Sequence, residues 1–213
     1  MTQISLHQGM PVAHYGAKVE TATAAMILLH GRGATAQDIL TLAREFHAPR
    51  VAFLAPQAAN STWYPNRFIA PVASNEPWLS SALAVVGGLV ASLVSAGIPH
   101  EKIALLGFSQ GGCLATEYAA RQPRRYAAVV GLSAGLIENG DQPRAYTGSL
   151  DGTPVLLGCS DVDFHIPLAR VERTAQIFTT LEAAVDKRIY PGMGHIVNQD
   201  EIDAIQRLLD DLA

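Results

Sequence analysis

The sequence predicts an α/β protein in which a mostly parallel central sheet carries helices on both faces. Short runs rich in β-branched and apolar residues alternate with longer stretches of helical spacing, and this alternation is typical of parallel sheets built from βαβ units. No internal repeat, low-complexity tract or linker composition divides the 213 residues. We therefore expect a single domain over residues 1–213, with no separate lid domain.

The predicted strands are short apolar runs that follow one another at the spacing expected when a helix separates each pair. Parallel strands are buried on both faces, so they show continuous apolar runs rather than an alternation of polar and apolar residues. The best candidates cover residues 25–29, 51–54, 103–106, 127–132, 155–157 and 187–190, and all of them are apolar runs except the last, which begins with Lys187 and Arg188. A weaker candidate covers residues 11–15.

The predicted helices are the stretches between these strands in which apolar residues recur at helical spacing. Thr35 is a typical N-cap residue, and Asp38 follows it at the distance of a capping box. Pro167 is suited to the first turn of a helix. The predicted helices cover residues 35–46, 78–96, 110–121, 168–181 and 199–212.

One apolar segment has to be tested as a membrane span. Residues 81–98 contain no charged side chain and approach the roughly 20 apolar residues that a span requires. Serines and glycines dilute the hydrophobicity of the segment, while its larger apolar residues recur at helical spacing. We therefore expect a largely buried helix and no stable membrane insertion.

Composition and charge exclude several classes of function. The net charge is −4 and the lysines and arginines are scattered, so no basic stripe is available for nucleic acid. Cys113 and Cys159 cannot build a disulfide framework and have no metal-site spacing, so buried free thiols are expected. The first 20 residues do not resemble a secretory signal, which favours a cytoplasmic location.

The most informative motif is Gly-x-Ser-x-Gly around Ser109. Gly107 and Gly111 flank the serine, an apolar run precedes the motif and an Ala-rich stretch follows it. A strand that reverses abruptly into a helix holds its turn residue in a strained conformation and brings two backbones together, so glycines are needed on both sides. Ser109 is therefore the candidate nucleophile.

A serine hydroxyl is a weak nucleophile until a histidine accepts its proton and an acid orients that histidine. In one large class of serine hydrolases the chain order is serine, acid, histidine. His195 lies on a glycine-flanked loop after the last strand and is the candidate base. Asp161 and Asp163 share the loop after the strand at 155–157; we favour Asp163 as the acid, with Asp161 as its rival.

The loop after the strand at 25–29 supplies the second half of a candidate oxyanion hole. Gly31 and Gly33 allow its backbone to approach a substrate, and the N–H of Arg32 lies between them. The N–H of Gln110, at the start of the predicted helix, can provide the other donor. We expect His30 to brace this loop through hydrogen bonds.

Two long connections, residues 56–77 and 133–153, follow strands at the edge of the sheet that displays Ser109, and we expect both to wall the pocket. Trp63, Tyr64 and Phe68, in the first connection, are the candidate substrate-binding residues because they suit an apolar acyl or aryl group. The alternative is that these aromatic side chains pack the loop onto the domain.

With these motifs in place, the whole chain resembles the phospholipase/carboxylesterase branch of the α/β-hydrolases, which includes bacterial carboxylesterases and acyl-protein thioesterases. Two departures stand out. Phe164 occupies a position where the acid motif of the family usually has proline, and Ala34 ends a motif that reads His-Gly-Leu-Gly-Asp in thioesterase members. The resemblance is carried by residues 28–33, 107–112, 163–167 and 191–195.

The resemblance implies an α/β-hydrolase fold and a small-molecule ester substrate, cleaved through an acyl-enzyme on Ser109 with no metal or organic cofactor. General ester hydrolysis is favoured over thioester cleavage because of the departure at Ala34. An acyl thioesterase or lysophospholipase is the alternative within enzymes. A ligand-binding protein without turnover is the alternative of another class, and the full set of Ser109, Asp163 and His195 argues against it.

Overall fold

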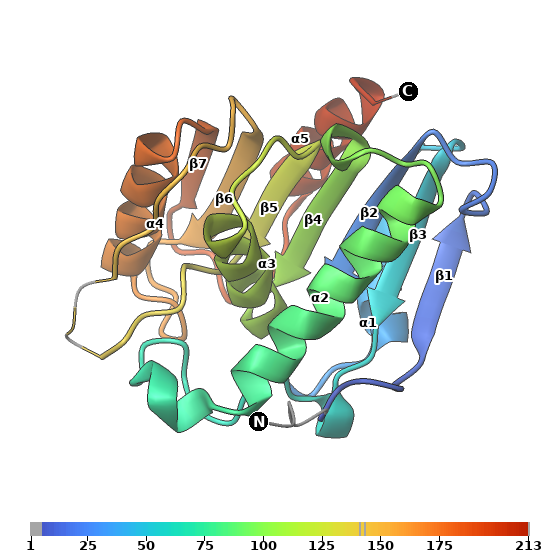
Figure 1. The fold of residues 1–213 in the computed structure, drawn as a ribbon. Coiled ribbons are helices and arrows are strands. Elements are labelled where there is room, and N and C mark those ends of the chain that lie inside the picture. The colour runs from blue at the N-terminus through green and yellow to red at the C-terminus, as the bar shows by residue number, and fades with distance from the viewer. Residues whose placement is uncertain (1–5, 141, 143, 213) are drawn as a thin grey trace.

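A computed structural model describes residues 6–140, 142 and 144–212, which form a seven-stranded sheet flanked by helices (Figure 1). The strand order is β1-β3-β2-β4-β5-β6-β7, and every neighbouring pair is parallel except β1 and β3. This confirms the predicted fold class. The strands are β1 (Val12–Gly16), β2 (Ala24–Leu29), β3 (Val51–Pro56), β4 (Ile103–Phe108), β5 (Ala128–Leu132), β6 (Pro154–Ser160) and β7 (Ala184–Tyr190).

All seven predicted strands are present, and the largest differences in their bounds are at the end of β6 and the start of β7. β1, the weak candidate, is the antiparallel edge strand and pairs only with β3. β7 begins at Ala184, before its predicted start, and its first residues include Asp186. The prediction therefore missed the first three residues of this edge strand, which is partly exposed and carries charged side chains, as edge strands commonly do.

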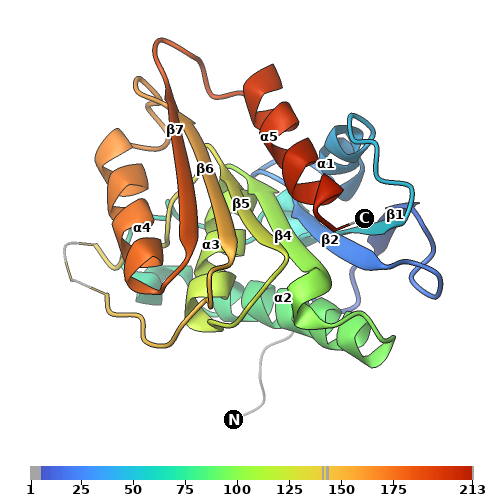
Figure 2. The same cartoon turned by 90° about the horizontal axis from the view of Figure 1, so that it is seen from above.

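The helices lie in two layers. The elements α1 (Ala36–Ala43) and α5 (Gln199–Asp210) cover one face of the sheet, and α2 (Trp78–Ser95), α3 (Gln110–Arg121) and α4 (Leu168–Thr180) cover the other (Figure 2). The predicted capping box is confirmed, because Thr35 Oγ1 accepts from the N–H of Asp38 and the Asp38 carboxylate accepts from the N–H of Thr35. Short 3₁₀ turns occur at Ala59–Ser61, Val72–Asn75 and His100–Lys102.

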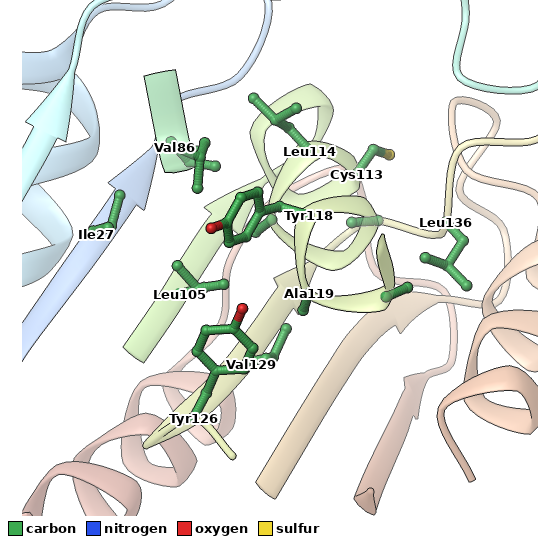
Figure 3. Packing of buried hydrophobic residues seen from close by; sticks show 14 of the residues in the cluster. Ile27, Val86, Leu105, Cys113, Leu114, Tyr118, Ala119, Tyr126, Val129 and Leu136 are labelled. Carbon is green, nitrogen blue, oxygen red and sulfur yellow. The ribbon is translucent and has the colours of Figure 1, made fainter. Parts of the chain in front are cut away.

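The sheet divides the hydrophobic core into two clusters. In the layer that contains α3, Leu114 and Tyr118 of the helix pack with Leu105 of β4 and Val129 of β5 (Figure 3). The opposite layer joins α1 and α5 to the other faces of the same strands. Because β2, β4 and β5 are buried from both sides, their carboxyl ends form a rigid platform for the loops that follow them.

The expectation for the apolar segment at 81–98 is only partly met. The helix α2 is long and apolar enough to cross a membrane by length and composition alone, and a third of its residues are buried. We expected this helix to be largely buried, and it is not. One stripe, which includes Leu79, Val86 and Leu93, packs into the core beside α3, and the opposite side faces outward.

The turn from β4 into α3 is the tightest backbone approach near the platform. A Cβ atom on Gly111 would overlap the carbonyl group of Leu29 at the end of β2, and one on Gly107 would overlap the carbonyl group of Gly111 itself. Two backbones can approach this closely only where no side chain separates them. The glycines of the Gly-x-Ser-x-Gly motif therefore fix the position of α3 against β2 and β4.

This contact predicts a specific loss of stability. We expect Gly111→Ala to lower the free energy of unfolding by about 1–3 kcal/mol, the usual range for overpacking a well-packed site, because the obstacle is backbone and cannot rotate away. Chemical denaturation followed by circular dichroism measures the change. Gly88→Ala in α2 is the matched control: its added Cβ meets open space, and replacing a helical glycine should raise stability by roughly 0.5–1 kcal/mol. Equal stability of Gly111→Ala and the wild type would contradict the argument.

Candidate functional site

Ser109 lies between β4 and α3 with φ 54° and ψ −121°. This backbone conformation is rare for a residue with a side chain, and such strain persists only where the surrounding structure enforces it. The serine N–H donates to the carbonyl oxygen of Leu132 at the end of β5, at 2.9 Å. The turn thus holds the hydroxyl at the carboxyl edge of the sheet, as the motif predicts.

A continuous hydrogen-bonded chain joins Ser109, His195 and Asp163. Ser109 Oγ lies 2.8 Å from His195 Nε2, and His195 Nδ1 lies 2.7 Å from Asp163 Oδ2. Because a carboxylate only accepts, Nδ1 must carry the proton in the neutral ring, which leaves Nε2 free to accept from the serine hydroxyl. The structure therefore brings together three side chains that the sequence places 86 and 32 residues apart.

The surroundings of Asp163 keep it charged. Burial of the side chain would raise its pKa, but hydrogen bonds from His195 and from the N–H groups of His165 and Ile166 outweigh burial, so the pKa lies below its ordinary value. The carboxylate is fully shielded from solvent. A buried, ionised acid both orients an imidazole and stabilises its protonated form.

Asp161, the rival acid, has a different partner. Its Oδ1 accepts from the N–H of Gly192 at 2.8 Å, in the loop that leads to His195. Asp161 thus holds the histidine loop from outside, whereas Asp163 contacts the ring itself. The geometry supports Asp163 over Asp161 as the acid that is hydrogen-bonded to His195.

Two backbone N–H groups are available beside the serine. Among the described residues, neither the N–H of Arg32 nor that of Gln110 has a backbone or side-chain acceptor, and both residues line the cavity that contains Ser109. Gln110 is the first residue of α3, where the helix dipole favours a negative charge. Unpaired donors at a helix start form a suitable site for an oxyanion.

The side chains of these two residues have a function that the sequence did not reveal. The Arg32 guanidinium donates to the carbonyl oxygens of Tyr64, Pro65 and Asn66 at 2.7–3.0 Å. The Gln110 side chain accepts from the N–H of Trp63 and donates to the carbonyl oxygen of Tyr64. Side chains from both sides of Ser109 therefore tie residues 63–66 to the site.

The cavity at Ser109 has a volume of about 330 Å³, at the small end of ligand pockets. Tyr64 and Phe68 line it, as predicted, but Trp63 does not. Trp63 is fully buried in the core, and its indole N–H donates to the carbonyl oxygen of His30. Its large ring is used to pack the loop onto the domain, so we correct the expectation that it contacts substrate. The lining residues are Gly31, Arg32, Ala34, Tyr64, Arg67, Phe68, Phe108, Ser109, Gln110, Cys113, His165, Ile166 and His195.

The second long connection also differs from its expected role. No described residue of 133–153 lines the cavity. This segment lies behind the first connection instead, where the N–H of Glu138 donates to the carbonyl oxygen of Phe68 at 2.8 Å. Glu138 also pairs with Arg170 of α4. The segment therefore supports the wall of the pocket without forming its surface.

His30, Cys113 and Cys159 have structural surroundings. His30 accepts from the N–H of Ala58 and so braces the loop, as expected. Burial raises the pKa of both Cys113 and Cys159 to about 12, and both are buried free thiols, as expected. Across the part of the chain that the structure describes, no group of three or more histidine, cysteine or acidic side chains is arranged to hold a metal ion.

A second, apolar cavity adjoins the first. It has a volume of about 380 Å³ and lies between α1 and α5, with Ile39 and Ile202 on its walls. The two cavities share Gly31, Ala34 and Phe108. Apolar space is therefore available beside the cavity that contains Ser109.

Comparison with known proteins agrees with this geometry. A model of the phospholipase/carboxylesterase family matches residues 13–212. The chain is 39% identical to a phospholipase/carboxylesterase from Dyadobacter fermentans, with a TM-score of 0.91 over 98% of this chain and 99% of that one. It is 26% identical to acyl-protein thioesterase 1 of Cryptococcus neoformans, over 89% of this chain and 92% of the relative. A carboxylesterase from Mesorhizobium loti, 18% identical, shares the fold with a TM-score of 0.73 over 99% of this chain and 97% of that one. The chain therefore belongs to the phospholipase/carboxylesterase family of α/β-hydrolases.

Proposed function

We propose that the protein is a serine carboxylesterase that cleaves small to medium carboxylic esters through an acyl-enzyme on Ser109. The observation that carries the proposal is the unbroken hydrogen-bonded chain from Ser109 Oγ through His195 to the buried Asp163 carboxylate. A binding protein would have no use for this arrangement beside a strained serine and two unpaired N–H donors. Membership in a carboxylesterase family supports the proposal.

In the proposed reaction, His195 takes the proton of Ser109 as the hydroxyl oxygen attacks the ester carbon. The N–H groups of Arg32 and Gln110 hold the oxyanion of the tetrahedral intermediate. Protonated His195 then gives its proton to the leaving alcohol. Water, activated by the same ring, releases the acid and restores the serine.

The residues that line the two cavities indicate where each part of the substrate would lie. Tyr64 and Phe68 contact the group nearest the reacting carbon, and Trp63 is left out because it is buried behind them. The α1–α5 cavity accepts an acyl chain that is too long for the first cavity. Together the two spaces fit a short or medium chain, and the described residues form no lid over them that could cover a longer one.

Thioester cleavage is a second candidate because the similar curated proteins include acyl-protein thioesterases at 25–29% identity. The same serine chemistry serves both substrates. Matched ester and thioester substrates with the same acyl group separate the two candidates through the ratio of their kcat/KM values. An oxygen-ester preference supports the carboxylesterase, and a strong thioester preference supports the alternative.

Covalent labelling tests the nucleophile. A fluorophosphonate should add one label to the protein, at Ser109, because only this hydroxyl has a hydrogen-bonded imidazole at 2.8 Å among the described residues. Ser109→Ala should lose both the label and the hydrolysis of an aryl acetate. Intact-mass and peptide mass spectrometry read out the label. Labelling at another serine, with activity retained in the variant, would overturn the mechanism.

The acid is tested by a matched pair of substitutions. Asp163→Asn should lower kcat by roughly 10⁴-fold, because the amide no longer selects the tautomer that frees Nε2. Asp161→Asn should have a much smaller effect, since an amide oxygen can still accept from Gly192. Steady-state kinetics on one activated ester compare them. The reverse ranking would transfer the role to Asp161.

Chain-length selectivity tests the assigned substrate space. Each buried methylene should contribute about 0.8 kcal/mol until the space is full, so kcat/KM across 4-nitrophenyl esters should peak at short or medium acyl chains and decline for palmitate. No activation is expected on adding micelles. Rising activity through palmitate, or a jump at the critical micelle concentration, would favour a lipid-directed enzyme instead.

A further inference from the structure

The cavity at Ser109 is lined by positive charge that the proposed ester chemistry does not use. Arg32 and Arg67 both line it, and no aspartate or glutamate does. Asp163 lies behind His195, where its carboxylate is fully shielded from solvent. The protein as a whole carries a net charge of −4, so this local concentration of positive charge runs against the overall balance.

The two arginines differ in how many of their donors are already engaged. The Arg32 guanidinium donates to three backbone carbonyl groups, so it contributes charge but few free donors. Among the described residues, the Arg67 side chain makes a single hydrogen bond, from Nη2 to the carbonyl oxygen of His165 at 3.2 Å. Arg67 is exposed and lines the cavity, and its remaining guanidinium donors have no acceptor among the described residues.

Neither guanidinium lies within 4.0 Å of a carboxylate in the part of the chain that the structure describes. Several arginines elsewhere in the protein do pair with acidic side chains. Buried Glu117 pairs with Arg121 and Arg144, and Glu138 pairs with Arg170 and Arg173. Within the cavity, the charges of Arg32 and Arg67 are therefore not balanced by an acidic lining residue.

We propose that the preferred substrate is an ester that also carries a carboxylate, and that Arg67 binds this carboxylate while the charge of Arg32 adds to the attraction. The proposal rests on the proposed esterase activity and names its substrate class. The planar fork of a guanidinium matches the two oxygens of a carboxylate, which gives both strength and orientation. A positively lined cleft in a net-negative protein also raises the local concentration of an anionic substrate.

The position of Arg67 makes it a determinant of specificity. Its contact with His165 places it beside the loop that carries Asp163, and the His165 ring lies 4.8 Å from the His195 ring. A carboxylate on Arg67 therefore lies close to the reacting centre but outside the hydrogen-bonded chain. Removal of the Arg67 guanidinium should therefore weaken substrate binding more than it slows the chemical step.

Two pairs of esters that differ only in charge test the proposal. In the first pair, 4-acetoxybenzoate and its methyl ester place the charge on the alcohol side. In the second, mono-4-nitrophenyl adipate and its methyl ester place it on the acyl side. We expect wild-type kcat/KM to favour the carboxylate member of at least one pair by about tenfold, through a lower KM, the size of one charge-assisted hydrogen bond at an open site. The preference should weaken at high ionic strength.

Variants then assign the preference to a residue. Arg67→Gln should bring the charged-to-neutral ratio close to one, and Arg67→Lys should retain part of it. Arg50→Gln is the matched control. It removes the same charge from an exposed arginine that precedes β3, at the opposite edge of the sheet from Ser109, and it should leave the ratio unchanged.

Absence of a charge preference in both wild-type pairs would overturn the proposal, and so would a preference that survives in Arg67→Gln. If Arg67→Gln does not fold, Arg67→Lys and the salt dependence of the wild type decide the question, and a salt-independent preference counts against it. If the charged and neutral members of both pairs are hydrolysed with equal kcat/KM, the substrate proposal fails but the proposed esterase function stands. Failure to hydrolyse every ester, with no label on Ser109, would instead reject the proposed function itself.

Discussion

The site depends on one close backbone contact, that of Gly111 with the carbonyl groups of Leu29 and His30. This contact sets the distance between the start of α3 and the loop that follows β2. One side of the contact carries Ser109 and the N–H of Gln110, and the other leads directly to Arg32. The nucleophile and both oxyanion donors of the proposed mechanism are thus held by a single approach of two backbones, anchored on strands that are buried on both faces. No flexible side chain intervenes, which suits a site that must be organised before the substrate arrives.

The same two donor residues also hold the wall of the pocket. Their backbones face the serine, while their side chains bind residues 63–66 through carbonyl groups and one N–H. A movement of this wall would therefore displace Arg32 and Gln110 or break their hydrogen bonds. These hydrogen bonds link the loop to the proposed oxyanion hole, and Glu138 supports it from behind through the carbonyl oxygen of Phe68. The shape of the pocket and the placement of the donors are two consequences of one hydrogen-bond network.

The central strands and the motifs next to them could be predicted from the sequence. Apolar runs located β2 to β6, and the Gly-x-Ser-x-Gly turn and the glycine-flanked His195 pointed to two side chains that the fold joins. Prediction failed where a residue type has two possible uses. An aromatic ring in a loop can face a ligand or the core, and Trp63 faces the core. The exposed β7 and the outward side of α2 were misjudged because periodicity does not reveal how much neighbouring structure covers a surface.

The arginine that ties the loop also shapes the electrostatics of the proposed reaction. To reach the carbonyl oxygens of Tyr64, Pro65 and Asn66, the Arg32 guanidinium has to lie at the cavity wall. Its field acts on the oxyanion that forms at Ser109 as well as on any anion bound at Arg67. Negative charge on the substrate and negative charge in the transition state are therefore favoured by the same group. An apolar side chain at this position could pack the loop, but it would supply neither the three donors nor the field.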